Sequence, residues 1–362
     1  MNLDISTTNV CNLGCTYCSE GHYSQELIEE RNLKGKTKVS SKEIRRIFDE
    51  RGDVHNIISF WGGEPLMNFD FIRETISEFL HDNVTFFFYT NGIFIKKYID
   101  ILDGLNKDLG ELPQYLVRGI PPQRLFIQIS YDGNPIHDRT RVKKNGKGTS
   151  EEVKEAIKLL QDRGIAYSLK STICPKDFKD MHKAFLDVIS LGSSYFPTPD
   201  LTNASVTPEE LRDLRLNLAL IAKTIKDNGY PHEIFKWFSD SKAKCSAGIN
   251  YFAVNTNKDI VVCHGALYGT DHIISRVDDI FATKKLNDFS EKQRYDLDRA
   301  YQDCDNCGVR FCMKCQFANY NLNTQIKDKK ERWYSLNHGM CKVWEVNSKV
   351  YNALLLALRY HK

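Results

Sequence analysis

The sequence predicts an α/β fold with a parallel sheet, followed by a smaller cysteine-rich domain. Between residues 3 and 197, short β-rich runs alternate with amphipathic helical stretches, which is typical of repeated strand–helix units. From residue 245 to residue 341 this periodicity fades and cysteines dominate. A chain of 362 residues is long enough for one large domain and a smaller one. We therefore expect a core domain over residues 1–200, a helical linker over 201–240, a cysteine-rich domain over 241–345 and a C-terminal helix over 346–362.

The core domain is predicted to alternate strands with helices in chain order. The first strand opens at Leu3 and leads directly to Cys11, and the later β-rich runs cover residues 54–60, 84–89, 125–130, 167–173 and 194–196. Apolar residues at helical spacing predict helices over residues 71–80, 95–102, 150–162 and 178–189. Capping-box sequences at residues 40–43 and 207–210 predict two further helix starts, the second opening a long helix to about residue 227. Residues 103–124 form a loop-rich insertion that is placed to line or cover a site.

Composition and charge exclude few classes of protein. Hydrophobic residues make up 41% and charged residues 27% of the chain, as in ordinary soluble proteins. The net charge of +3 neither demands nor excludes a nucleic-acid partner. Residues 1–10 do not resemble a signal peptide, and no apolar run approaches the roughly 18 residues of a membrane span. We therefore expect a cytoplasmic protein with no membrane association, in which the eleven cysteines favour metal coordination over disulfides.

The distinctive motifs of the core domain each follow the end of a predicted strand. They occupy residues 11–18, 62–65, 90–92 and 131–133. Parallel α/β folds bind ligands at the carboxyl ends of their strands. We therefore expect these four segments to surround one pocket.

The first motif contains three cysteines at offsets of four and three residues: Cys11, Cys15 and Cys18. A [4Fe–4S] cluster takes four ligands, so a three-cysteine site leaves one iron open to a small molecule. A zinc knuckle and three unrelated core thiols are the alternatives. Three ligands on one cluster favour catalysis over simple electron carriage.

Together with Tyr17, these three cysteines resemble the signature of radical S-adenosylmethionine (SAM) enzymes. The resemblance implies that SAM binds the open iron through its amine and carboxylate. It also implies that one-electron reduction cleaves SAM to a 5′-deoxyadenosyl radical. The fold implied is a partial (β/α)6 TIM-like barrel.

Three further segments resemble the SAM-binding motifs of that family. Residues 62–65 match the segment whose glycine backbone and Glu64 carboxylate receive the methionine ammonium. Read singly, each of these segments is an ordinary turn. The resemblance implies the following cofactor-binding residues: Tyr17, Gly62, Gly63, Glu64, Pro65, Asn91, Ser130, Asp132 and Arg141.

The later cysteines resemble a SPASM domain, an auxiliary-cluster module found in peptide-modifying radical enzymes. The paired spacing also suits a zinc ribbon. The family's ligation implies one cluster on Cys245, Cys263 and Cys315, and a second on Cys304, Cys307, Cys312 and Cys341. The spacings are slightly shorter than usual, Lys258 stands where glycine is common, and the first auxiliary cluster lacks a fourth cysteine. Cys174 fits neither set and is predicted to be a buried thiol.

The resemblance therefore predicts an enzyme that uses SAM and three [4Fe–4S] clusters, one catalytic and two auxiliary. An external electron donor such as flavodoxin or ferredoxin would reduce it. The predicted substrate is a peptide or protein, oxidised or cross-linked at a side chain or the backbone. The chain reaches Cys11 too early to hold a leader-recognition module, so a separate recognition protein is a possible partner.

The residue after Cys263 suggests a catalytic role. Sulfatase-maturating enzymes, which have a similar layout, carry an acidic base there, whereas this chain has His264. Histidine accepts a proton near neutral pH, so we predict His264 as a catalytic residue, with a structural histidine as the alternative. Because the acidic base is replaced, formylglycine-type sulfatase maturation is less favoured.

Modification of a nucleotide or nucleic-acid base is the alternative function. A non-enzymatic electron carrier conflicts with the incomplete ligation at the first motif.

Overall fold

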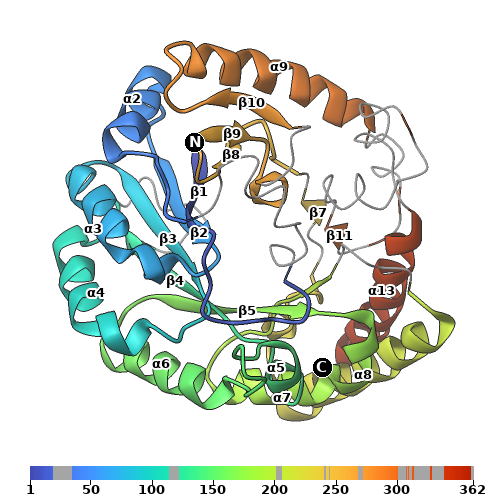
Figure 1. Ribbon diagram of the computed structural model, residues 1–362. Coiled ribbons are helices and arrows are strands. Elements are labelled where there is room, and N and C mark those ends of the chain that lie inside the picture. The colour runs from blue at the N-terminus through green and yellow to red at the C-terminus, as the bar shows by residue number, and fades with distance from the viewer. Residues whose placement is uncertain are drawn as a thin grey trace. The chain divides into compact units, whose positions relative to one another are not determined.

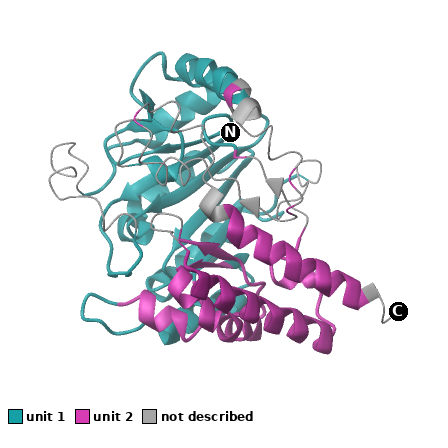
Figure 2. Cartoon of the chain, turned by 90° about the vertical axis from the view of Figure 1, so that its right-hand side faces the viewer, with its two compact units in different colours: residues 1–130, 143–168, 246–295 teal, residues 131–142, 169–245, 296–362 magenta. Residues whose placement is uncertain are grey.

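The computed structural model confirms the α/β class and the parallel sheet (Figure 1). It describes residues 1–18, 35–113, 122–200, 206–239, 242–243, 245–267, 272–300, 307, 309, 312–313, 327 and 338–359. The chain forms two compact units, coloured in Figure 2. Unit 1 contains residues 1–130, 143–168 and 246–295, and unit 2 contains residues 131–142, 169–245 and 296–362. The predicted linear division at residues 200, 240 and 345 stays a prediction.

Unit 1 is built on a sheet in the strand order β10-β9-β8-β1-β2-β3-β4. Its parallel strands are β1 (Asn2–Thr8), β2 (Asn56–Gly62), β3 (Val84–Thr90), β4 (Leu125–Ser130) and β8 (Tyr251–Val254). Strands β9 (Asp259–Val261) and β10 (Ile273–Arg276) extend it in antiparallel pairing. Strand β8, from the cysteine-rich half of the chain, pairs directly with β1. The segment that contains Cys263 is thereby attached to the first strand of the core.

Helices cover the outer side of this sheet (Figure 1). They are α2 (Ser41–Arg51), α3 (Phe69–Glu78), α4 (Ile95–Leu109) and α6 (Ser150–Asp162), and α9 (Ala282–Ala300) begins in the same unit. Alternate strand residues are fully buried, including Phe60, Phe86 and Phe88. The ring of Phe60 lies 5.1 Å from that of Phe88 and 6.2 Å from that of Phe86. The intervening residues, such as Trp61 and Tyr89, are partly exposed on the other face. One face of the sheet therefore forms the core, and the other is available for a site.

Unit 2 contains the remaining core elements. Strand β5 (Tyr167–Ile173) continues into it and pairs in parallel with β6 (Pro197–Pro199). Its helices are α5 (Ile136–Thr140), α7 (Met181–Ser190), α8 (Pro208–Asn228) and α13 (His338–Arg359), and a short parallel pair joins β7 (Lys242–Ala243) to β11 (Cys312–Met313). No described helix is long and apolar enough to serve as a membrane span.

Local sequence signals fix several of these elements. Both capping boxes are present: the Ser40 hydroxyl accepts the Glu43 amide at 3.3 Å, and the Glu43 carboxylate accepts the Ser40 amide at 2.9 Å.

Two other residues singled out in the sequence are Lys258 and Cys174. Lys258, in the turn between β8 and β9, has a φ of +76°, which explains why glycine suits this position. Its ammonium pairs with the Glu43 carboxylate at 2.6 Å. Cys174 is buried as predicted, and burial raises its pKa to about 12.

The main differences from the predicted elements have tertiary causes. The sixth strand is displaced from residues 194–196 to Pro197–Pro199, because Tyr195 forms a parallel bridge with Phe235 instead. Helix α4 runs beyond residue 102 to Leu109, which shortens the expected 103–124 insertion. Residues 114–121 of that insertion lie outside the described part of the chain.

Gly62 provides a test of how closely β2 approaches β1. Its φ is +126°, and a Cβ atom there would lie 2.1 Å from the Thr8 carbonyl oxygen. We expect Gly62→Ala to lower the free energy of unfolding by about 3 kcal/mol or more, through backbone strain and overpacking. Denaturant unfolding under anaerobic conditions measures this. Gly104→Ala, in α4 with no atom within 4 Å of the added methyl, is the matched control and should stabilise by about 0.5–1 kcal/mol. Equal stabilities of the two variants would contradict the close approach.

Candidate active site

The loop after β1 holds the three cysteines of the first motif. The Cys11 thiol accepts the Leu13 amide at 3.5 Å, and the Cys18 amide donates to the Cys15 carbonyl at 3.2 Å. Burial raises the pKa of Cys11 to about 12, with smaller contributions from Glu64, Cys15 and Cys18. Negative charge on Cys15 or Cys18 therefore disfavours the Cys11 thiolate. A cationic centre would relieve this repulsion, so the donor chemistry suits an iron–sulfur cluster.

The side chains are not arranged as a finished metal site. Within the described ranges, no three His, Cys, Asp or Glu side chains are grouped so that they would hold a metal ion. The ligand assignment at Cys11, Cys15 and Cys18 therefore stays a prediction. Tyr17, the aromatic residue of the motif, is partly exposed in the same loop.

Residues 62–65 attach the end of β2 to this cysteine loop. The Gly63 amide donates to the Thr8 carbonyl at 2.8 Å, and the Glu64 amide donates to the Val10 carbonyl at 2.9 Å. A Cβ atom on Gly63 would lie 2.4 Å from the Val10 carbonyl oxygen. Pro65 opens a short 3₁₀ helix, Pro65–Asn68, and its carbonyl accepts the Thr7 hydroxyl. In this structure the two glycines allow β2 to pack against the backbone that leads into Cys11.

The Glu64 carboxylate links this turn to the end of β3. The side chain is fully buried and accepts the Thr90 hydroxyl at 2.7 Å, the Asn91 amide at 2.8 Å and the Leu66 amide at 3.1 Å. Burial raises the pKa of Glu64 to about 7, and the three hydrogen bonds oppose this rise. Glu64 thus acts as an internal brace that joins the ends of β2 and β3. The sequence instead predicted that its carboxylate binds the methionine ammonium of SAM. That role for Glu64 stays a prediction.

Asn91 completes the connection between β3 and the cysteine loop. Its side-chain amide donates to Asn12 Oδ1 at 2.8 Å and lies 3.9 Å from Cys11 Sγ. Ser130, the last residue of β4, is partly exposed. The structure therefore brings the motifs after β1, β2 and β3 into direct contact. The predicted pocket that also includes residues 131–133 stays a prediction.

In unit 2, Asp132 and Arg141 bind each other. Two guanidinium nitrogens of Arg141 lie 3.0 and 3.1 Å from the two oxygens of Asp132, and both residues are buried. The same carboxylate accepts the Thr140 hydroxyl and the Thr172 amide. This network fixes the segment from 131 to 142. It gives the two residues a structural task, while their predicted cofactor contacts are not tested.

His264 lies in a network on the inner side of the unit 1 sheet. It starts a 3₁₀ turn, His264–Ala266, after β9. Its Nδ1 lies 3.2 Å from Asp4 Oδ2 and contacts the Tyr251 hydroxyl, which donates to the same Asp4 oxygen at 2.6 Å. The Tyr251 oxygen also accepts the His264 backbone amide at 3.2 Å. Trp61 stacks on the imidazole with ring centres 4.3 Å apart.

The sequence reasoning missed Asp4, Tyr251, Trp61 and Lys170. Asp4 lies between Leu3 and Ile5 in β1, and a charged residue in a buried strand signals a special task. Burial raises the pKa of Tyr251 well above its usual value, with Asp4 adding to the shift. In unit 2, Lys170 lies 3.4 Å above the Phe196 ring, and burial lowers its pKa to about 7.

The predicted auxiliary-cluster ligands are described only in part. Cys263 is buried, Cys245 and Cys341 are partly exposed, and Cys307 is exposed. Cys312 lies in β11, while Cys304 and Cys315 lie outside the described residues. The predicted grouping into two clusters is therefore not tested.

Comparison with known proteins identifies the core. Residues 5–116 match the radical SAM superfamily. The chain contains a radical SAM domain. The chain is an enzyme, and the matched segment includes the cysteine loop, the Glu64 turn and the Asn91 segment.

Similar proteins extend the comparison over the whole chain. The chain is 22% identical over 350 residues to a cysteine-type anaerobic sulfatase-maturating enzyme of Clostridium novyi (strain NT), covering 92% of this chain and 85% of the relative. The structure of anSMEcpe with bound AdoMet and the Cp18Cys peptide matches with a TM-score of 0.72 and 16% identity, over 100% of this chain and 99% of that chain. Streptococcus suis SuiB bound to precursor peptide SuiA matches with a TM-score of 0.58 and 14% identity, over 91% and 74%. These structural matches show a shared fold.

The brace at Glu64 predicts a stability effect. Glu64→Ala leaves three buried donors without an acceptor, so we expect the free energy of unfolding to fall by about 3 kcal/mol or more. Denaturant titration of the anaerobic protein measures the change. Glu152→Ala, which removes an exposed partner of Lys143, is the control and should cost less than about 1 kcal/mol.

The pH dependence of stability gives a second readout of the Glu64 brace. Because the folded-state pKa of about 7 lies above the ordinary 4.5, the folded protein holds this proton more tightly than the unfolded chain. The wild type should therefore lose stability relative to Glu64→Gln as the pH rises from 4.5 towards 7. A difference independent of pH would show that folding does not raise the pKa of Glu64.

Proposed function

We propose that this radical SAM enzyme abstracts hydrogen from a side chain or the backbone of a peptide or protein, and so oxidises or cross-links it. The observation that carries the proposal is the Asp4–Tyr251–His264 network on the inner face of a radical SAM sheet. That network would supply a proton acceptor, and its imidazole contacts Trp61, the residue that precedes the turn at residues 62–65. Similarity to a sulfatase-maturating enzyme, and to folds whose structures contain bound peptides, supports a peptide substrate.

Cys11, Cys15 and Cys18 would hold the catalytic cluster, and the turn at residues 62–65 lies directly against their loop. With SAM bound, this cluster would supply a 5′-deoxyadenosyl radical when an external donor such as flavodoxin or ferredoxin delivers an electron. The remaining predicted cysteines would hold two auxiliary clusters. These clusters would accept the electron that the substrate loses.

The chain's own residues would manage the substrate proton. The Tyr251 hydroxyl stays protonated and donates a hydrogen bond to Asp4 Oδ2. Asp4 Oδ2 can only accept, so its second hydrogen bond requires a hydrogen on His264 Nδ1. In the neutral imidazole Nε2 is then the hydrogen-bond acceptor, and Trp61 stacks on the ring. The His264 side chain is 44% exposed, so a bound substrate would be able to reach Nε2. His264 would therefore accept the proton, and Asp4 would position it and stabilise its cation.

Formylglycine-type sulfatase maturation is a second candidate. The observation in its favour is the Asp4 carboxylate beside His264, because sulfatase-maturating enzymes carry an acidic base at the position of His264. Incubation with a cysteine-containing sulfatase peptide and mass spectrometry of the product would distinguish this reaction from cross-linking.

Iron content and SAM cleavage test the cofactor assignment. We expect anaerobically reconstituted protein to bind about twelve irons, as three four-iron clusters. Replacing Cys11, Cys15 and Cys18 together by alanine should remove roughly a third of the iron and abolish reductive cleavage of SAM to 5′-deoxyadenosine. Cys174→Ala, at a buried thiol outside both sets, should leave both quantities unchanged. Zinc retained by the later cysteines after anaerobic preparation would contradict the auxiliary clusters.

His264→Ala tests the proton acceptor. SAM cleavage should persist, while product formation falls by the roughly 10²–10⁴-fold typical of a lost acid–base group. Asp4→Asn should shift the pH profile of product formation, because it alters the group that holds Nδ1. His81→Ala, at an exposed histidine, serves as the control. Normal product formation by His264→Ala would make His264 structural.

A further inference from the structure

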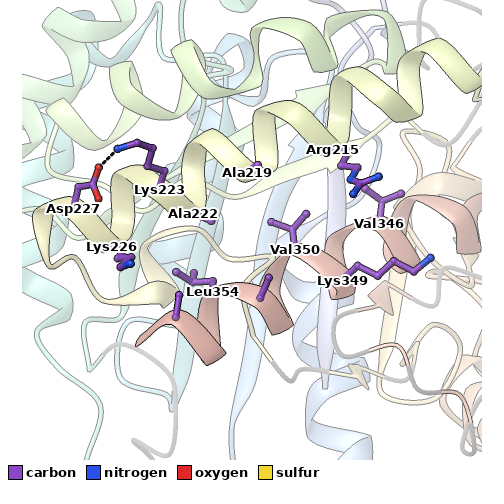
Figure 3. Close-up of a pocket in the computed structure, with 12 residues that line it drawn as sticks. Arg215, Ala219, Ala222, Lys223, Lys226, Asp227, Val346, Lys349, Val350 and Leu354 are labelled. Carbon is purple, nitrogen blue, oxygen red and sulfur yellow. Dashed lines mark hydrogen bonds and ion pairs between the residues drawn. The ribbon is translucent and has the colours of Figure 1, made fainter. Parts of the chain in front are cut away.

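Helices α8 and α13 of unit 2 enclose a groove of about 890 Å³ (Figure 3). The helices pack side by side and run in the same direction, from Arg215 and Val346 at one end to Lys226 and Leu354 at the other. The lining section of α8, residues 215–227, is roughly 18 Å long at 1.5 Å per residue. The groove thus has room for about three helical turns of another chain.

Small side chains leave this space open. Ala219 and Ala222 line it from α8, and Ala353 and Ala357 line it from α13. Leucine would extend into the groove from either helix without loss of helix propensity. On the solvent side of α8, Leu216 is 56% exposed and Leu220 is 47% exposed. The groove and its margin therefore present apolar surface that a partner would bury.

The border of the groove is basic. Arg215, Lys226 and Lys349 line it, and their side chains have no hydrogen bond or ion pair with any described residue. The fourth cation, Lys223, pairs with Asp227, the one acidic side chain of the lining (Figure 3). Three positive charges around an apolar floor are complementary to a partner that carries both acidic and apolar residues.

Charge and composition argue against two other occupants. A two-fold contact between copies of this chain would place the same basic face against itself. Single-stranded nucleic acid is usually held by aromatic side chains that stack on its bases, and none of the lining residues is aromatic. An acidic amphipathic segment avoids both problems, because its carboxylates meet the cations and its apolar side chains cover the alanines and leucines.

We propose that the groove between α8 and α13 binds an acidic, amphipathic segment of the peptide or protein substrate, apart from the part that reacts. This inference rests on the proposed function for the identity of the segment's owner. The groove lies wholly within unit 2, whereas the Asp4–Tyr251–His264 network lies in unit 1. Binding in the groove and chemistry at His264 therefore use different residues and are separable by experiment.

The test is a direct binding measurement on the anaerobic holoenzyme. The probe is a fluorescein-labelled helical peptide of about 14 residues with leucines on one face and glutamates on the other, followed by fluorescence anisotropy. The wild type should bind it, and affinity should fall as salt rises from about 50 to about 500 mM. Arg215→Glu, Lys226→Glu and Lys349→Glu combined should weaken binding by about tenfold or more. Ala219→Leu with Ala353→Leu, at two exposed positions, should also weaken it by filling the groove.

The controls separate this inference from the proposed function. Lys158→Glu, Lys284→Glu and Lys292→Glu combined change net charge equally at exposed sites elsewhere, and should leave the affinity within about twofold. Reductive SAM cleavage should be normal in every groove variant, because none touches the radical SAM site. Equal binding by the charge-reversed groove and its control, or equal binding of a probe with lysines in place of glutamates, would overturn the proposal. So would a dimer that the groove substitutions dissociate, or an oligonucleotide that displaces the probe.

Discussion

The candidate active site depends on one buried carboxylate. Glu64 follows β2, yet its side chain accepts hydrogen bonds from Thr90 and Asn91 at the end of β3. Its backbone amide meanwhile holds Val10, one residue before Cys11. Burying an ionisable group is costly unless it is hydrogen-bonded, and three donors satisfy this one. The ends of three parallel strands are therefore held together at the place where the cysteine loop begins.

The two faces of the unit 1 sheet divide folding from chemistry. On one face, Phe60, Phe86 and Phe88 are fully buried and build the core beneath the helices. On the other, Trp61 stacks on His264, which hydrogen-bonds with Asp4 and Tyr251. Alternation along each strand lets a single sheet do both, since successive side chains point to opposite faces. The pairing of β8 with β1 brings Tyr251 and His264 to this inner face.

Most of the core fold was predictable from local signals, and part of the site was not. The capping box at Ser40, the helix over residues 150–162 and the strand-end position of residues 62–65 follow from residues near each other in sequence. The role of Glu64 as a brace, by contrast, depends on Thr90 and Asn91, some 26 residues away. The role of Asp4 likewise depends on Tyr251 and His264, which lie about 250 residues later.

The sequence by itself determined the α/β class, the cysteine loop after the first strand and the family that this loop and the motifs at residues 62–65 and 90–92 resemble. These features are encoded by spacing within short segments, and short-range spacing is visible in a linear chain. The tertiary structure alone decided that Gly63 packs against Val10, that Asp4 and Tyr251 orient His264, and that α8 and α13 leave a basic groove between them. Each of these results from strand pairing or helix packing between distant segments, and that geometry exists only once the chain has folded.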